Sequence, residues 1–203
     1  MIYHATAPSN IALIKYMGKI SGNRATNPSL SYRLDSLVTY VELEAISGSK
    51  DIWTELPDLR FVNYLPMNLK MGWDAGSSNL ASSEQERFLN HLSLIRRAYG
   101  SEQHFVVRSK NNFPKSCGLA SSAASFAALT KTAALAFAQI EKKNLISEKE
   151  QSELSRQGSG SSIRSFYGPW CIWDQRGARK VQLPYKDLIH RVVVVDSEEK
   201  KIS

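Results

Sequence analysis

The stretch Pro114–Ala128 constrains the fold of this chain more than any other part of the sequence. A proline and Gly118 bracket a short loop, Ser121 and Ser122 follow, and an alanine-rich segment with helical spacing then begins. Small residues let a polyanion approach the main chain, and the first N–H groups of a helix have no partner inside the helix. These donors and the positive end of the helix dipole predict a phosphate site. The alternative is a turn in which a serine caps a buried helix.

Length and composition fit one globular domain, because 203 residues with 42% hydrophobic content can bury a core of useful size. The N-terminus lacks the features of a signal peptide, and no apolar run approaches the roughly 20 residues of a membrane span. We therefore expect no membrane partner. Cys117 and Cys171 are expected to be reduced thiols in a cytoplasmic protein.

The formal net charge is +7, and most of the excess lies in the second half of the chain. Such a balance suits nucleic acid, an acidic membrane surface or a small polyanionic substrate. The sequence contains no long Lys/Arg run and no RGG-like or zinc-ligand pattern. We therefore expect no nucleic-acid partner and favour the small polyanion.

A first polar cluster follows the N-terminal apolar segment. Residues 11–16 alternate as in a strand buried on both faces, and Gly18 ends it. Lys15, Tyr16 and Lys19 gather there, where a strand delivers side chains into a cleft, and a lysine is costly to bury without a partner. The alternative is two surface lysines near a turn.

A second candidate anion site is the stretch Ser155–Ser165, which holds two glycines and several serines at a predicted helix start, with Arg164 one turn in. The alternative is a flexible linker, but a linker should not run directly into an apolar segment and a strand. The remaining pattern predicts strands and helices around these blocks. Strands are expected over 29–34, 37–46, 51–53, 61–63, 104–109, 170–173 and 191–196, and helices after capping boxes at Ser83 and Ser147 and over about 121–141.

Three blocks, Asn10–Lys19, Asn112–Ala124 and Ser155–Ser165, now stand in order. Together they closely resemble the mevalonate diphosphate decarboxylases, a branch of the GHMP kinase superfamily. The middle block is shared by the wider superfamily, whereas the first and third are specific to the decarboxylase branch. The resemblance covers nearly the whole chain.

The resemblance implies an α+β fold in which residues 1–203 form a GHMP-kinase-type N-terminal domain with a left-handed βαβ unit. The ferredoxin-like C-terminal domain of the family is missing from these residues. The implied reaction is the ATP-dependent decarboxylation of mevalonate 5-diphosphate to isopentenyl diphosphate in isoprenoid biosynthesis. The tertiary 3-hydroxyl is first phosphorylated, and phosphate and carbon dioxide then leave. ATP and Mg²⁺ are the implied cofactors, and a homodimer is implied for the full-length enzyme.

Carried over motif by motif, the resemblance also implies roles for individual residues. Lys15 should stabilise charge near the transferred phosphoryl group, and Arg164 should hold the substrate carboxylate bidentately, which lysine could not do. The substrate diphosphate should be bound by Tyr16, Lys19, Ser159 and Ser161. The nucleoside should meet Ser109 and Asn111, and the phosphates should meet Gly118, Leu119, Ala120, Ser121 and Ser122, with Ser122 also on Mg²⁺.

Three positions depart from the family pattern. Met17 stands where the family usually has tryptophan, and Gly168-Pro169 stands where it usually has two glycines. The catalytic aspartate, in an Asp-Ala-Gly-Pro-Asn motif, is expected beyond Ser203, so this chain alone is expected to be inactive. The similar segment Asp74–Asn79 precedes a capped helix, in the wrong part of the fold, and is interpreted as a coincidence.

Two other functions remain open from the sequence. One is a related GHMP small-molecule kinase that does not decarboxylate, against which Arg164 and the complete third block argue. The other is a truncated, non-catalytic protein that binds polyanions, which the missing aspartate and the +7 charge suggest.

Overall fold

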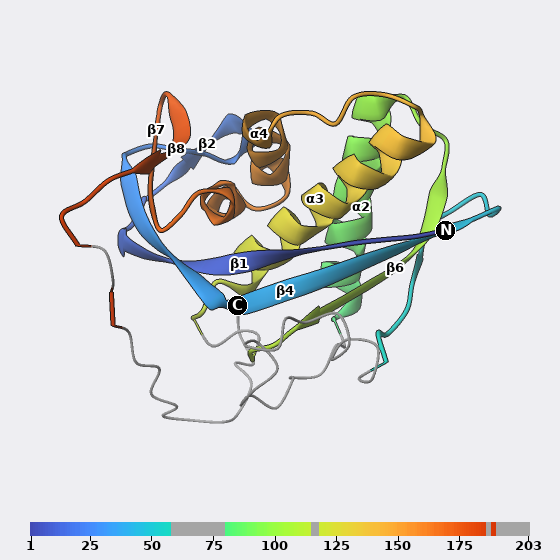
Figure 1. Ribbon diagram of the computed structural model, residues 1–203, viewed down its shortest axis with the longest axis horizontal. Helices are drawn as coiled ribbons and strands as arrows, with labels where there is room; N and C mark the ends of the chain where they lie inside the picture. The colour runs from blue at the N-terminus through green and yellow to red at the C-terminus, as the bar shows by residue number, and fades with distance from the viewer. Residues whose placement is uncertain (58–79, 115–117, 186–187, 190–203) are drawn as a thin grey trace.

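The computed structural model describes residues 1–57, 80–114, 118–185 and 188–189 (Figure 1). Its main sheet is built on the 18-residue strand β4 (Ser29–Ile46). The strand β1 (Ile2–Ile14) runs antiparallel along one edge of β4. The other edge is shared by β6 (His104–Asn111) and β7 (Trp170–Asp174), which are both antiparallel to β4. One long strand therefore connects segments from the start, middle and end of the chain.

The βαβ element lies at the far side of β6. The short strand β5 (Ile52–Trp53) pairs with β6 in parallel, and the connection between them contains α2 (Ser82–Tyr99). Gly100 ends α2 in the left-handed conformation, with φ of 61°, which glycine adopts readily. This arrangement of a parallel pair joined through a helix agrees with the βαβ unit that the resemblance implies.

Two small β-ribbons complete the sheet region. The strand β8 (Gly177–Val181) extends the main sheet from β7, and no sequence pattern had predicted it. The strands β2 (Lys19–Ile20) and β3 (Arg24–Ala25) form a separate ribbon around the 3₁₀ turn η1 (Ser21–Asn23). This ribbon follows the polar cluster at the end of β1.

The helices lie on one side of the sheet, with α3 (Ser121–Ile140) running across it (Figure 1). Alanines dominate the buried face of α3, so the helix packs close to the strands. The core joins this face to Val41, Leu43, Phe105 and the apolar side of α2. The helix α4 (Glu148–Gly158) and the 3₁₀ segment η3 (Gly160–Phe166) then pack beside α3.

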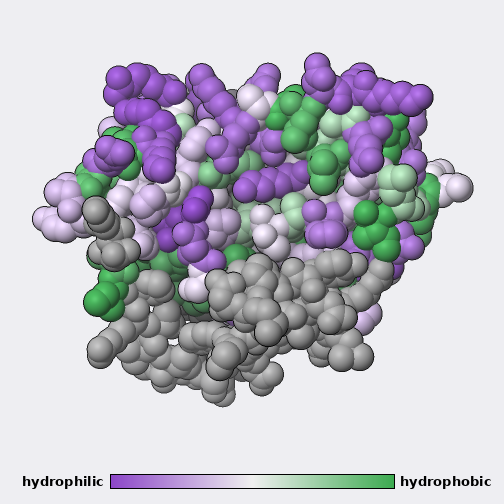
Figure 2. Space-filling view, in the orientation of Figure 1, coloured by the Kyte–Doolittle hydropathy of each residue, from purple (hydrophilic) through white to green (hydrophobic). Residues whose placement is uncertain are grey.

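By length and composition alone, α3 is apolar enough to cross a membrane, although 72% of the relevant window is buried inside the protein. That burial is what a core helix of the domain requires. On the face that Figure 2 shows, hydrophobic residues of the described ranges lie in small groups between hydrophilic ones.

Several boundaries differ from the sequence predictions. The two strands predicted over 29–34 and 37–46 are one strand, because β1 pairs along almost all of it. β1 is not buried on both faces at its end: Ile11, Leu13 and Ile14 are 36%, 49% and 56% exposed, whereas Ala7 and Ser9 earlier in the strand are fully buried.

The helix predictions show one error and two successes. The capping box predicted at Ser83 is wrong: α2 begins at Ser82, and the Glu84 carboxylate accepts a hydrogen bond from the Ala81 amide at 3.0 Å. The box at Ser147 is confirmed, with reciprocal bonds to Glu150. The bounds predicted for α3 are confirmed within one residue. The predicted strands 61–63 and 191–196, the segment Asp74–Asn79 and Cys117 lie outside the described residues.

Candidate functional site

The start of α3 carries an open set of backbone donors. Gly118 and Ala120 both have left-handed backbones, with φ of 82° and 51°. No side chain caps the helix, and its first hydrogen bonds run from the amides of Ala123 and Ala124 to the Ala120 carbonyl. The amides of Ser121 and Ser122 precede these bonds and lie at the open end of the helix. The geometry therefore favours the phosphate site over the serine cap, because the N-cap residue is an alanine.

A small cavity of about 60 Å³ opens beside these serines. β6 contributes Asn111, and α2 contributes Glu84 and Arg87, two charged residues that the sequence reasoning missed. Asn111 is held by Thr39, whose hydroxyl donates to its Oδ1 at 2.6 Å. The remaining lining residues come from α2, from α3 and from the segment just before α2: Leu80, Phe88, Ser121, Ser122, Ser125 and Phe126.

The residues predicted to contact the nucleotide do not share one environment. Ser109 lies two residues before Asn111 in β6 and is buried, and it does not line this cavity. Leu119 is also buried, with its side chain in the small core formed by Leu34, Leu37, Phe113 and Ala124. We therefore find Asn111, Ser121 and Ser122 together, whereas Ser109 and Leu119 lie beneath them.

Oxygen ligands suited to Mg²⁺ are present at this cavity. Ser122 and Glu84 both line it, and one carboxylate oxygen of Glu84 accepts a hydrogen bond from the Ala81 amide. Mg²⁺ in phosphate sites commonly takes one or two carboxylates together with phosphate oxygens, so this donor set fits the ion. Within the described ranges, no group of three or more His, Cys, Asp or Glu side chains could hold a metal by itself.

The centre of the second cluster is Arg164 in η3, which is only 4% exposed. Its Nη1 donates to the hydroxyl of the buried Ser29, and its Nε has no hydrogen-bond partner in the described part of the chain. No ion pair to Arg164 is present among the described residues. Burial lowers the pKa of this guanidinium from its ordinary value, although an arginine remains charged in a protein.

Two cationic side chains and the ring of Trp173 lie around the ring of Tyr16. The Arg164 guanidinium lies 5.5 Å from the centre of the Tyr16 ring, and the Lys19 Nζ lies 5.9 Å from it. Trp173 of β7 meets the same ring edge-on, with 5.1 Å between centroids. The structure thus joins three of the predicted substrate residues around one ring. Trp173 is a neighbour that the sequence reasoning missed.

Ser159 and Ser161 lie next to this cluster, at the junction of α4 and η3. Their hydroxyls are 3.4 Å apart. A Cβ on Gly160 would approach the Asn23 carbonyl to 3.1 Å and the Lys19 Cε to 3.5 Å, so glycine lets η3 approach the β2–β3 ribbon. The predicted anion site at a helix start is corrected here, because η3 is a seven-residue 3₁₀ segment and the side chains must supply the donors.

Lys15 lies directly after the end of β1 and its side chain is exposed. Its carbonyl accepts a hydrogen bond from the Asn27 amide at 3.2 Å. Asn27 also accepts from the Met17 amide at 2.8 Å, so this asparagine holds the turn that carries Lys15 and Tyr16. The structure shows no contact of the Lys15 amine with the rest of the predicted site.

Two adjacent residues of β1 connect the two clusters. The Ser9 hydroxyl donates to the Leu119 carbonyl in the loop before α3. The Asn10 amide donates to the Ser161 carbonyl at 3.2 Å and to the Ser165 hydroxyl at 2.8 Å, on either side of Arg164. Asn10 stood in the first sequence block without an assigned role, and Ser9 gave no recognisable signal.

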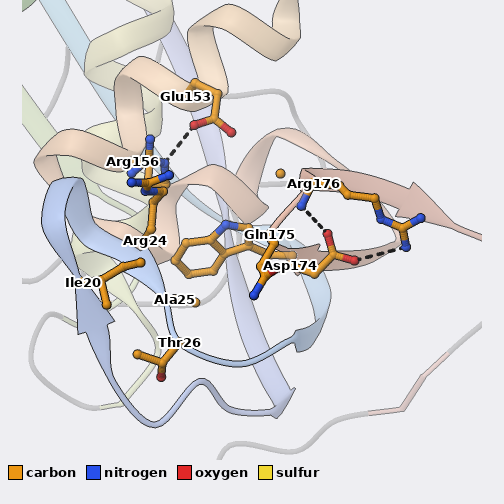
Figure 3. Close-up of a pocket in the computed structure, with 11 residues that line it drawn as sticks. Ile20, Arg24, Ala25, Thr26, Glu153, Arg156, Asp174, Gln175 and Arg176 are labelled. Atoms are coloured by element: carbon orange, nitrogen blue, oxygen red, sulfur yellow. Dashed lines mark hydrogen bonds and ion pairs between the residues drawn. The ribbon is translucent and has the colours of Figure 1, made fainter.

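A larger cavity of about 570 Å³ lies between the β2–β3 ribbon, α4 and the β7–β8 turn (Figure 3). Trp173 lines it and also touches Tyr16, so it borders the Arg164 cluster. The acidic side chains here are paired, because Glu153 meets Arg156 at 2.8 Å and Asp174 meets Arg176 at 3.4 Å. Hydrogen bonds from Arg179 and Arg176 hold the pKa of the Asp174 carboxyl well below its usual range.

The described cysteine is not a candidate nucleophile. Cys171 is a free, buried thiol on β7, and burial raises its pKa to about 11. A thiol with such a pKa is protonated near neutral pH and therefore unreactive.

Solved structures resemble the whole arrangement. A mevalonate diphosphate decarboxylase from Legionella pneumophila is 46% identical, with a TM-score of 0.85 over 100% of this chain and 61% of that one. A structure described as MDDEF in complex with MVAPP, AMPPCP and magnesium is 28% identical, with a TM-score of 0.66 over 89% of this chain and 50% of that one.

Sequence relatives and a family match agree with these structures. A diphosphomevalonate decarboxylase from Eremothecium gossypii is 31% identical over 96% of this chain and 49% of its own length. The chain thus spans about half the length of the curated relatives that it matches. Residues 70–182 match the family described as the diphosphomevalonate decarboxylase-like N-terminal domain. Since residues 70–182 make up more than half of the chain, the chain belongs to that family.

Proposed function

We propose that this chain carries the nucleotide- and substrate-binding part of an ATP-dependent decarboxylase that converts mevalonate 5-diphosphate to isopentenyl diphosphate. The names of its relatives support the substrate and the reaction. A neighbour that holds MVAPP, AMPPCP and magnesium together supports two adjacent anion sites and Mg²⁺.

The observation that carries the proposal is the buried Arg164. A buried guanidinium without an anionic partner is costly, because it has left water without gaining a counter-charge. Ser29 satisfies one of its nitrogens, while Nε remains unpaired among the described residues. A substrate carboxylate would supply both the missing charge and the missing acceptor, and guanidinium binds carboxylate bidentately. The surroundings of Arg164 therefore favour the binding of an anionic ligand.

The other residues of this cluster would hold the diphosphate end of the substrate. Lys19 supplies a cation, and the hydroxyls of Tyr16, Ser159 and Ser161 supply hydrogen-bond donors. Arg164 would then fix the carboxylate so that it is oriented for loss as carbon dioxide once the 3-hydroxyl has become a leaving group. Decarboxylation depends on that orientation, because a positioned group reacts more readily than a free one.

The nucleotide would be bound at the start of α3. The open amides of Ser121 and Ser122 would meet its phosphates, and Asn111 would meet the nucleoside. Ser122 and Glu84 would hold Mg²⁺, which when bound neutralises charge on the phosphate oxygens. Lys15 would stabilise the charge that develops near the transferred phosphoryl group. The catalytic aspartate that the resemblance places beyond Ser203 takes no part in this proposal.

Isothermal titration calorimetry of the 203-residue chain tests the proposal. We expect saturable binding of AMPPCP with Mg²⁺ and of mevalonate 5-diphosphate, each weakened by added salt because both ligands are polyanions. Circular dichroism on the same sample shows whether the chain is folded. A folded chain that binds neither ligand would overturn the proposal.

The homodimer implied by the resemblance and the cytoplasmic location expected from the cysteines and the N-terminus belong to the same proposal. Sedimentation equilibrium of the full-length gene product checks the first. Fractionation of the producing cells checks the second.

A further inference from the structure

The loop before α3 has a backbone that its own sequence does not favour. Leu119 stands between Gly118 and Ala120, whose φ values are 82° and 51°. Glycine adopts such values freely, whereas a left-handed alanine costs roughly 1–2 kcal/mol. A residue held in this region persists only where its surroundings determine it. Something outside the loop must therefore hold Ala120 in place.

Two contacts at Leu119 do so. Its side chain is buried in the small core with Leu34, Leu37, Phe113 and Ala124. Its carbonyl accepts the hydrogen bond of Ser9, which lies in β1, 110 residues earlier in the sequence. Ser9 is completely buried, so its hydroxyl has no water to bind instead. The peptide group between Leu119 and Ala120 is thus held on its Leu119 side by a buried side chain and by a hydrogen bond to its carbonyl.

We propose that Ser9 is a positioning residue for the nucleotide phosphates. By holding the Leu119 carbonyl, Ser9 sets the orientation of the peptide that leads into Ala120, and so the direction in which the amides of Ser121 and Ser122 point. This inference rests on the proposed function, because it concerns the same phosphate site. The side chain of its neighbour Asn10 hydrogen-bonds to η3, whereas that of Ser9 hydrogen-bonds to the loop before α3, so we assign Ser9 to the nucleotide side.

A ligand-free measurement tests the hydrogen bond itself. The amides of Ala123 and Ala124 donate to the Ala120 carbonyl and so report the geometry of the loop. We expect Ser9→Ala to increase hydrogen–deuterium exchange at these two amides about threefold to tenfold, because one hydrogen bond contributes about 0.5–1.5 kcal/mol. Exchange in α2 should not change.

Ser31→Ala is the matched control. Ser31 is also a buried strand serine, and its hydroxyl also reaches a backbone carbonyl, that of Cys171 at 3.5 Å. It does not touch the loop. Equal exchange at Ala123 and Ala124 in Ser9→Ala and Ser31→Ala would overturn the proposal.

Ligand binding supplies the second readout. We expect Ser9→Ala to raise the Kd for AMPPCP with Mg²⁺ about threefold to tenfold, while the Kd for mevalonate 5-diphosphate stays within twofold of the wild-type value. Adding Ala120→Gly should recover part of the nucleotide affinity, because glycine adopts the left-handed conformation without an outside contact to hold it there. Equal weakening of both ligands, or no recovery with glycine, would mean that Ser9 has only a general structural role.

The outcomes separate this inference from the proposed function. If the wild-type chain binds no nucleotide, the proposed function fails, while the exchange measurement still decides whether Ser9 holds the loop. If Ser9→Ala does not fold, Ser9→Cys keeps a weak donor of similar shape and should show the same effects in smaller size. A folded Ser9→Cys with unchanged exchange and unchanged nucleotide affinity would also overturn the inference.

Discussion

Single residues at this site are buried in ways that ordinary packing does not explain. Arg164 keeps its charge at 4% exposure with one serine as its hydrogen-bond partner. Among the described residues, the nearby Asn10 has no hydrogen-bond partner for its Oδ1, while its side-chain N–H groups donate to Ser161 and Ser165. Unsatisfied buried polar atoms are rare in native proteins and commonly mark functional positions. Two of them around η3 indicate where a ligand completes the structure.

The residue pattern predicted which side chains matter here, but not their environment. The third block singled out Arg164 because its glycines and serines have a recognisable spacing. Its burial against Ser29 and the ring of Tyr16 depends on how β4 and β1 pack against η3, and no spacing within one block encodes that. Ser9 was missed for the same reason, since its partner lies 110 residues away.

His91 gives the molecule a specific sensitivity to acid. It is buried on α2, meets the Thr130 hydroxyl at 3.0 Å, and has a pKa lowered by burial to about 4. The unfolded chain binds this proton at its ordinary pKa of about 6.5, so unfolding takes up a proton between pH 6.5 and pH 4. Stability therefore falls as the pH falls through this window, and His91 accounts for a loss of about 2 kcal/mol between pH 7 and pH 5.

Replacing His91 with glutamine should remove this contribution, because glutamine keeps a polar group near Thr130 and does not titrate. The measurement is the free energy of unfolding in urea at pH 7 and pH 5, for wild type and His91→Gln. We expect a smaller pH dependence in the variant. The same pH dependence in both proteins would show that the histidine is not held neutral.

At the scale of elements, local signals predicted the positions of the helices and of β6 and β7 well. The reciprocal Ser147–Glu150 bonds and the left-handed Gly100 are short-range features that the sequence displays directly. The ribbon β2–β3 and the strand β8 could not be predicted, because strands of two to five residues form only where a partner strand is present. Whether residues 29–46 form one strand or two likewise depends on the pairing of β4 with β1.

Gly158 shows how closely three helices approach one another. It ends α4, and a Cβ at this position would lie 2.1 Å from Cδ1 of Phe126 on α3 and 2.9 Å from Cγ of His91 on α2. Both neighbours are buried rings, so neither can move without disturbing the core. We expect Gly158→Ala to lower the free energy of unfolding by about 1–3 kcal/mol, as overpacking does in other cores.

The control for this change is Gly48→Ala. Its added Cβ would meet the tip of the Ile46 side chain at 3.3 Å, and that side chain can turn away. Urea denaturation of both variants should show a clear loss for Gly158→Ala and little change for Gly48→Ala. Equal stability of the two variants would contradict the packing seen at the helix junction.

Considered as a whole, the molecule builds its two proposed anion sites from different elements, which pack against each other. The nucleotide side is built on α3, β6 and α2, whereas the substrate side is built on η3, the end of β1 and β7. The side chain of Ser9 hydrogen-bonds to the nucleotide side and that of Asn10 to the substrate side, and α3 also packs directly against η3. Each site should therefore lose its ligand independently when one of its own residues is changed.

Thermal unfolding tests this independence in a single assay. A ligand at 100 times its Kd adds about 2.7 kcal/mol to the stability of the folded state, so each ligand should raise the Tm of the chain. Arg164→Lys should abolish most of the shift caused by mevalonate 5-diphosphate and keep the shift caused by AMPPCP with Mg²⁺, because lysine cannot bind a carboxylate bidentately. Ser122→Ala should show the reverse pattern. If both variants lost both shifts equally, the two ligands would share one site, and the assignment of α3 to the nucleotide and of η3 to the substrate would be wrong.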